Sequence, residues 1–371
     1  MASNRRLYIL LGSDCDPDRP QYGGVGYDVR DGLTWRGVSQ GVPKARELAD
    51  QVSREIGLPV RVTWCVRSDD QMARLYDDPA WSYRSQDGLW KDLAAKGDEI
   101  AWHAHLWRWD ESADCWYQET EDADWASACL SQGHSALVNA AGVPVNTSRM
   151  GWEFHNDHTM QTVDALGVRQ DFTAIANWYT PGESSRGSRF HCYCDWRGTP
   201  ATPYQPGRAD YRRPAEPGRE SLSVTEIPLS TFTSGLLGGL RTVRKALRSR
   251  GPRGLTAAFS AGIWRGTASK AYVTIQPMVF RKLIAERLRA VERSSDGTAV
   301  LATAFHPDDF LEDGSQSLYS SRHFAVNLRL IVASAQARFI EPVFVTAEEL
   351  GQRFNGGAGA GCQAPSAREA P

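Results

Sequence analysis

Several features that mark other classes of protein are missing from this 371-residue sequence. No apolar run approaches the roughly 20 residues that a membrane-spanning helix needs, so we expect no transmembrane segment. The formal net charge is only −2, which argues against attraction to nucleic acid or to an anionic membrane surface. The hydrophobic content of 41% is nevertheless sufficient for a large buried core. The sequence therefore predicts a globular protein whose partners are neither nucleic acid nor membrane.

Cysteine is also scarce, with seven residues of this type in the chain. An odd number, mostly inside expected helices and strands, fits reduced thiols in the cytoplasm better than a disulfide framework. Cys192 and Cys194 would share one face of a strand, but no second cysteine pair completes a zinc site. The apolar run 7–11 is too short for a signal peptide and meets Asp14 and Asp16 where small residues should stand. We therefore expect a cytoplasmic location.

Short β-rich runs alternate with segments of helical periodicity along most of the chain. Such β–α units, without a run of hairpins, are typical of an α/β fold with a parallel sheet or barrel. The predicted strands are residues 7–11, 60–66, 100–105, 143–145, 298–305 and 342–345. The predicted helices are residues 42–55, 87–96, 124–141, 156–166, 322–337 and 347–354.

Two regions interrupt the alternation and are predicted to be insertions. Residues 182–218 are rich in Gly, Pro, Arg and Ser, which is typical of a long functional loop or a disordered segment. Residues 236–253 contain six basic residues, which favours a solvated helix face, with contact to an anionic partner as the alternative. Residues 355–371 have the composition of a disordered tail. We predict a single domain over residues 1–354.

Two of the predicted strand ends carry side chains that can bind a metal ion. Asp14 and Asp16 follow the first apolar run, and His103 and His105 end the third. Alternate residues of a strand share a face, and the carboxyl ends of parallel strands meet at one rim of a barrel. One aspartate with two histidines is a common ligand set for hydrolytic zinc or for non-haem iron. Helix-capping aspartates and histidines satisfied within the core are the alternatives.

Two more polar residues follow predicted strands and are candidates for catalysis. Arg149 would either orient a buried carboxylate or form a surface ion pair of little value. His306 would lie at the same rim, where a pKa near neutrality suits a proton donor to a leaving amine. Thirteen tryptophans, several of them near these positions, suit either stacking on sugar rings or packing in the core.

The order of these motifs resembles that of the polysaccharide deacetylase superfamily, the NodB-type or carbohydrate esterase family 4 proteins. Asp14-Cys15-Asp16 is similar to the family's first motif, in which an aspartate base precedes a metal-binding aspartate. The segment 97–100, Gly-Asp-Glu-Ile, is similar to the one before the second motif, which has two histidines four residues apart. His103 matches the first of these, but Trp107 holds the second position and His105 lies between them.

The remaining motifs extend the resemblance over residues 7–354. The segment 149–152, Arg-Met-Gly-Trp, is similar to the third motif, Arg-x-Pro-Tyr. Phe305-His306 is similar to the fifth, an apolar residue followed by histidine. The fourth has only a loose counterpart in residues 194–196, Cys-Asp-Trp. The resemblance implies a distorted (β/α) barrel of about seven strands.

The activity that the resemblance implies is removal of an N-acyl group from an amino sugar or glycoconjugate by a metal-dependent hydrolase. Asp16, His103 and His105 would hold a divalent cation, with Zn²⁺ expected. A non-catalytic glycan-binding relative and an iron enzyme with two histidines and one carboxylate are the alternatives.

The resemblance also implies a role for four residues around that cation. Asp14 would be the general base, positioned by Arg149. The backbone N–H of Trp152 would face the oxyanion, and His306 would protonate the leaving nitrogen.

Overall fold

Eight parallel strands form the central sheet of the computed structural model, which describes residues 5–24, 32–180, 193–233, 268–311 and 319–355. Seven of them follow one another in the order β12 (Thr225–Glu226), β7 (Gln170–Asp171), β6 (Thr147–Met150), β3 (Glu99–Ala104), β2 (Thr63–Arg67), β1 (Arg6–Cys15) and β15 (Thr298–Phe305). The eighth, β16 (Glu341–Val345), also pairs with β1. Just beyond β12, the N–H of Ser230 donates to the carbonyl of Ala302 in β15 at 2.9 Å. The sheet thus curls into a distorted (β/α) barrel, as the resemblance implied.

Strand β1 lies at the centre because both of its faces are apolar, as in other strands covered on two sides. Leu7, Ile9 and Leu11 belong to one buried cluster, which includes residues from the surrounding helices. Tyr8 and Leu10 belong to a second cluster with residues from β2, β15 and β16. Since side chains alternate along a strand, the second set continues through residue 12 to the two aspartates at the end of β1.

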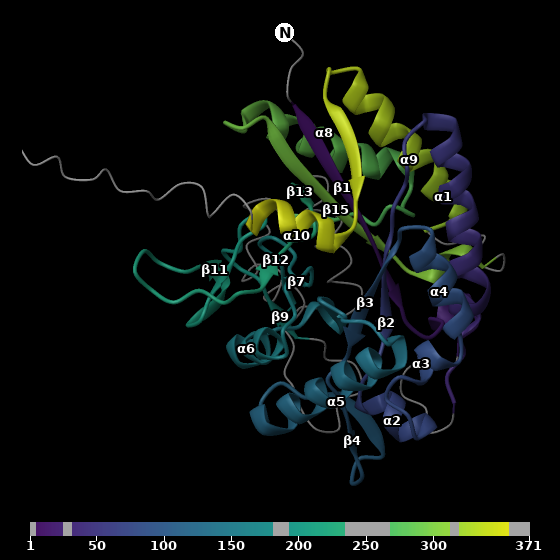
Figure 1. Cartoon of the computed structure of the whole chain (residues 1–371), viewed down its shortest axis with the longest axis vertical. Coiled ribbons are helices and arrows are strands. Elements are labelled where there is room, and N and C mark those ends of the chain that lie inside the picture. Colours follow the sequence, from purple (N-terminus) through teal and green to yellow (C-terminus); the bar gives the residue numbers. More distant parts are fainter. Residues whose placement is uncertain (1–4, 25–31, 181–192, 234–267, 312–318, 356–371) are drawn as a thin grey trace, which may run out of the picture.

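Helices cover the outside of this sheet, and α1, α4 and α9 lie along one side of it in Figure 1. Side chains cap three of them: Asp122 for α5, Asn156 for α6 and Ser320 for α9. The main helices are α1 (Val42–Ile56), α4 (Asp87–Ala95), α5 (Ala123–Ala141), α6 (Asp157–Ala165), α8 (Pro277–Arg293), α9 (Ser321–Gln336) and α10 (Ala347–Asn355). None of the helices in the described ranges has the length and apolarity to cross a membrane.

Most predicted elements are confirmed within a few residues, and the differences have local causes. The strand predicted at 143–145 is wrong: α5 ends at Ala141 with Gly142 as its C-cap, and pairing begins only at Thr147. The helix predicted from residue 124 begins at Ala123 because Asp122 is its N-cap. The sequence analysis missed α8 and the shorter helices α2 (Asp70–Tyr76) and α3 (Trp81–Arg84).

Four antiparallel pairs, also missed, lie outside the central sheet. They are β4 (Trp107–Asp110) with β5 (Cys115–Gln118), β8 (Tyr179–Thr180) with β9 (Cys194–Asp195), β10 (Pro206–Gly207) with β11 (Asp210–Pro214), and β13 (Thr231–Thr233) with β14 (Ala268–Lys270). Of the predicted insertions, residues 193–218 are described, whereas the basic segment 236–253 and residues 356–371 of the predicted tail lie outside the described ranges. The single-domain organisation over residues 1–354 therefore stays a prediction.

Candidate metal centre and active site

The parallel register brings the polar residues together at the carboxyl ends of four neighbouring strands. Arg67 of β2 is paired with His103 of β3, which is paired in turn with Arg149 of β6. Asp14 lies at the end of β1, level with Cys65 of β2. This rim is where ligands and catalytic groups converge in barrels of parallel strands.

The Asp14 side of the rim is an ion pair between two buried residues. Arg149 donates from Nε to Oδ1 of Asp14 at 2.5 Å and from Nη2 to Oδ2 at 3.2 Å. Its remaining nitrogen, Nη1, donates to the carbonyl of Phe172 at 2.7 Å. Burial opposes ionisation of Asp14, but Arg149, followed by His103 and His306, lowers its pKa to about 2. Asp14 is therefore an oriented, ionised carboxylate at neutral pH.

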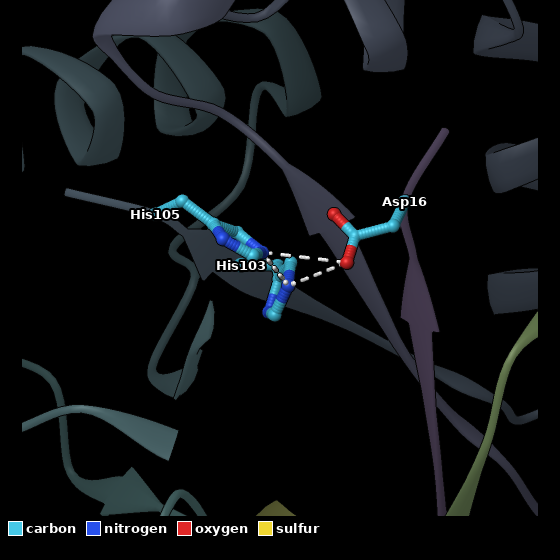
Figure 2. A group of neighbouring side chains, drawn as sticks. All are labelled: Asp16, His103 and His105. Atoms are coloured by element: carbon cyan, nitrogen blue, oxygen red, sulfur yellow. Dashed lines mark hydrogen bonds and ion pairs between the residues drawn. The ribbon is translucent and has the colours of Figure 1, made fainter. Parts of the chain in front are cut away.

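The Asp16 side of the rim is a cluster of three potential metal ligands (Figure 2). Nε2 of His105 lies 3.3 Å from Oδ2 of Asp16 and 3.1 Å from Nε2 of His103. Nε2 of His103 lies 3.4 Å from the same Asp16 oxygen. All three residues are buried, and the two rings face the carboxylate from neighbouring positions at the end of β3.

The dimensions and chemistry of this cluster fit a divalent cation. Zinc–nitrogen bonds of 2.0–2.1 Å in a tetrahedron place neighbouring donor atoms about 3.3 Å apart, close to the three separations observed. Nδ1–H of His103 donates to the carbonyl of Arg149 at 2.6 Å, so Nε2 is the ring nitrogen that faces Asp16. Against the opposing effect of burial, Asp16 raises the pKa of His103. Burial and Arg67 lower the pKa of His105 to about 4, so this imidazole is neutral at pH 7. Neutral imidazole is the form that binds metals.

Gly151 makes room for His105 in this cluster. A Cβ atom at position 151 would lie 2.1 Å from Cδ2 and 2.2 Å from Nε2 of the His105 ring. The N–H of His105 donates to Oδ2 of Asp69 at 2.9 Å, which fixes the backbone on the other side. Glycine at position 151 therefore leaves the space that the His105 ring occupies.

The turn that carries Trp152 is backbone-strained and held from several sides. Trp152 and Glu153 have φ of 56° and 53°, in the left-handed region that residues with a side chain seldom adopt. Nε1 of Trp196 donates to the carbonyl of Glu153 at 2.7 Å, and Lys270 of β14 forms an ion pair with the Glu153 carboxylate. The Trp152 ring stands edge-on to His105, with centroids 6.2 Å apart. The Trp152 side chain thus lies beside the cluster of Asp16, His103 and His105.

His306 directly follows β15 and lies near Asp14. Its Nε2 is 4.0 Å from Oδ2 of Asp14, and its ring stands edge-on to Tyr272. Burial and Arg19 lower the pKa of His306, against the opposing effect of Asp14, so it rests as a neutral imidazole. Arg19 is fixed by Asp308, which accepts hydrogen bonds from its backbone and its guanidinium.

All seven site residues predicted from the sequence thus lie around one point of the rim. The tryptophans divide: Trp102, Trp107 and Trp196 are buried in the core, whereas Trp152 and Trp178 are partly exposed. The loose counterpart of the fourth motif contributes only indirectly, through the Trp196 hydrogen bond to the strained turn.

The sequence analysis missed the residues that hold two of the potential ligands and the strained turn in place. Arg67 and Asp69 contact Asp16 and His105, and Lys270 binds Glu153. A single signal was available: Arg67 directly follows the second predicted strand, 60–66, at the level where the other strands carry candidate functional residues.

A buried acidic network, also missed, lies on the neighbouring strands β7 and β12. Asp171 accepts a hydrogen bond from Ser148 and faces His155 at 3.5 Å. Burial and the charge of Asp171 raise the pKa of the neighbouring Glu226 well above its usual range. Oε1 of Glu226 accepts from the N–H of Ala174 at 2.9 Å. Glu226 therefore keeps its proton to a higher pH in the folded protein than in the unfolded chain.

No family model matches this chain, and no curated protein sequence matches it significantly. Solved structures do match it. A candidate glycoside hydrolase/deacetylase from Parabacteroides distasonis aligns with 95% of this chain and 71% of its own, at 12% identity and a TM-score of 0.54. A candidate polysaccharide deacetylase from Mycobacterium smegmatis aligns with 100% of this chain and 96% of its own, at 15% identity and a TM-score of 0.48. The chain shares the fold of the candidate glycoside hydrolase/deacetylase.

Within the deacetylase fold, the elements that carry the site follow the predicted order of motifs. Asp14 and Asp16 end β1, His103 and His105 end β3, and His306 follows β15. At these identities the likeness concerns the fold. The buried cluster of Asp16 with two histidines is a property of this chain, and it could hold a divalent metal.

Proposed function

We propose that this protein is a metal-dependent hydrolase that removes an N-acyl group from an amino sugar or glycoconjugate. One observation carries the proposal: two aspartates of one strand end, two residues apart, have different partners. Asp14 is bound by Arg149 and faces His306, whereas Asp16 joins two imidazoles. Hydrolysis of an amide needs both a metal centre and a separate base, and this rim offers the residues for each.

Asp16, His103 and His105 would hold the divalent cation, and we propose Zn²⁺. Three protein ligands with an open position are the usual arrangement of a catalytic zinc site. When bound, the cation would polarise the amide carbonyl and acidify a water molecule.

Asp14 would accept the proton of the attacking water. Arg149 binds both of its oxygens, so the carboxylate is held in one orientation and stays ionised at neutral pH. Its second oxygen, Oδ2, is the one that faces His306. The base and the proposed acid are therefore neighbours, and the proton that Asp14 removes has a short path to the leaving nitrogen.

Trp152 and His306 would act on the two ends of the breaking bond. The Trp152 N–H would stabilise the developing oxyanion, an effect for which the loss of one donor typically costs ~3–4 kcal/mol. His306 would donate a proton to the leaving nitrogen, after gaining it during the reaction because it rests neutral. The strain in the 151–153 turn supports this assignment, since strained backbone is found at functional sites.

A sugar substrate is supported by partly exposed aromatic rings near the rim. Trp152 lies beside the metal cluster, and Trp178 lies near Lys270, at 5.7 Å from its Nζ. Aromatic rings with one exposed face suit stacking on sugar rings. A cytoplasmic location remains part of the proposal and favours a small glycoconjugate as the substrate.

The decisive experiment is deacylation of a panel of N-acetylated amino sugars and oligosaccharides by protein loaded with one equivalent of Zn²⁺. We expect release of acetate and of a free amine, absent in Asp14→Asn loaded in the same way. Glycan binding without turnover would favour the non-catalytic relative. Iron-dependent oxygen consumption would favour the iron enzyme, and either result would contradict the proposed hydrolysis.

A further inference from the structure

Arg67 is a buried cation in direct contact with Asp16, one of the three potential metal ligands. Its side chain is fully buried, and Nη1 donates to Oδ1 of Asp16 at 2.9 Å. Its Nε donates to Oδ2 of Asp69, and its Nη2 donates to Oε1 of Gln71 at 2.7 Å. All three nitrogens of the guanidinium are thus engaged, so Arg67 cannot turn away from Asp16 without leaving these partners.

The two oxygens of Asp16 consequently have different neighbours. Oδ1 accepts from Arg67, and Oδ2 is the oxygen that both histidines approach, at 3.3 and 3.4 Å. With Oδ1 occupied, Asp16 has one oxygen left for a cation. One oxygen of Asp16 therefore binds the Arg67 guanidinium, and the other is left to bind a divalent cation.

Asp69 links Arg67 to the rest of the cluster. Its Oδ2 accepts from both Arg67 and the N–H of His105, and its Oδ1 accepts from the N–H of Met72 at the start of α2. The same carboxylate therefore holds the arginine and one of the ligand histidines in place. Counting Arg67, Asp16 and Asp69, the buried group carries one net negative charge, where the two carboxylates alone would carry two.

We propose that Arg67 is the resident counter-ion of Asp16 in the metal centre. Its guanidinium shares Asp16 with the divalent cation and weakens the binding of that cation. The inference rests on the proposed function, which assigns Asp16, His103 and His105 as ligands. Its physical basis is repulsion between a fixed guanidinium and a divalent ion across one carboxylate. Arg67 also compensates the charge of Asp16 when no ion is bound, so folding should not depend on metal.

The test is the zinc dissociation constant of the full-length protein, measured by competition with a chromophoric chelator. Arg67→Gln removes the charge but keeps a hydrogen-bond donor near Oδ1 of Asp16. Arg67→Lys keeps the charge but loses the planar fork. We expect Arg67→Gln to bind Zn²⁺ about tenfold more tightly than the wild type or better, and Arg67→Lys to remain within about threefold. The rise in Tm on adding Zn²⁺ should be larger in Arg67→Gln.

Asp69→Asn gives an independent measurement if the Arg67 variants do not fold. The single oxygen of asparagine can keep the position of Oδ2, which accepts from Arg67 and His105, while its NH2 group loses the cap on the Met72 N–H, and the buried group loses a negative charge. We expect weaker Zn²⁺ binding by about tenfold. Binding in Asp69→Asn as tight as in the wild type would overturn the inference.

The outcomes separate this inference from the proposed function. If the wild type binds Zn²⁺ and folded Arg67→Gln binds it equally or less tightly, the counter-ion role is wrong and the metal centre stands. If only Arg67→Gln binds metal, the counter-ion role is supported and the proposed function is contradicted. If neither protein binds a divalent cation, both assignments fail.

Discussion

The two aspartates at the end of β1 lie two residues apart, and each is bound by its own buried arginine, yet their surroundings differ. Arg149 engages both oxygens of Asp14. Arg67 engages one oxygen of Asp16 and leaves the other to two histidines. We refer to these surroundings as the Asp14 side and the Asp16 side of the rim.

The difference shows how the partner of a carboxylate directs its chemistry. A bidentate guanidinium orients the carboxylate and keeps it ionised, which suits a group that must accept a proton from water. A guanidinium that takes only one oxygen leaves a donor atom for a cation, which suits a metal ligand. The same residue type can thus serve as base and as ligand within one strand end.

Loss of a ligand on the Asp16 side should have the largest effect. His105→Ala removes one of three donors, so we expect metal content to fall from near-stoichiometric to background and activity to disappear. Elemental analysis of protein purified without chelator measures the first effect. His134→Ala is the matched control, since His134 is also buried but its ring hydrogen-bonds to the carbonyl of Val145 and packs against Trp102. Full metal content in His105→Ala would remove this residue from the ligand set.

Asp14→Asn should lower turnover without changing zinc binding, because it removes the proposed base and spares the proposed ligands. The amide is nearly isosteric with the carboxylate but cannot accept the proton, so we expect turnover to fall by roughly 10²–10⁴-fold. Zinc titration should give the wild-type stoichiometry. A folded, zinc-loaded variant that retains most of its activity would show that Asp14 is not the base.

Gly151→Ala should affect the Asp16 side alone, and by less. The added Cβ would push against the His105 ring, so that ring must shift by a fraction of an ångström or more. We expect zinc affinity to fall by about 10-fold, comparable to the loss of an outer partner of a ligand. The Asp14–Arg149 pair should be unaffected, so activity at saturating zinc should largely return. Unchanged affinity would mean that position 151 does not constrain His105.

Glu226→Gln should change stability and its pH dependence, with little effect on either side of the rim. Because the pKa of Glu226 is raised in the folded state, the folded protein keeps a proton that the unfolded chain releases above about pH 4.3. The stability of the wild type is therefore full below this pH and falls as the pH rises toward the folded-state pKa. Glutamine mimics the protonated carboxyl, so we expect Tm to rise by a few degrees at pH 8 and not at pH 4. Equal Tm differences at both pH values would show that Glu226 is ionised in the fold.

Much of the site could be predicted because its residues directly follow apolar runs. The run at 7–11 and the run at 298–305 both form strands, and the polar residues after them lie at the rim. The Trp107 position is instructive: its ring packs in the core 6.2 Å from the parallel ring of His105, so the residue at the family's histidine position is no ligand.

The sequence by itself determined which strand ends carry carboxylates and imidazoles, because alternation and burial are local properties of the chain. The tertiary structure alone decided how these groups are paired. Arg149 is 135 residues from Asp14, and Arg67 is 51 residues from Asp16. Contacts at such separations depend on the order and register of the parallel strands, which local patterns do not encode. The different surroundings of the two neighbouring aspartates follow from that register.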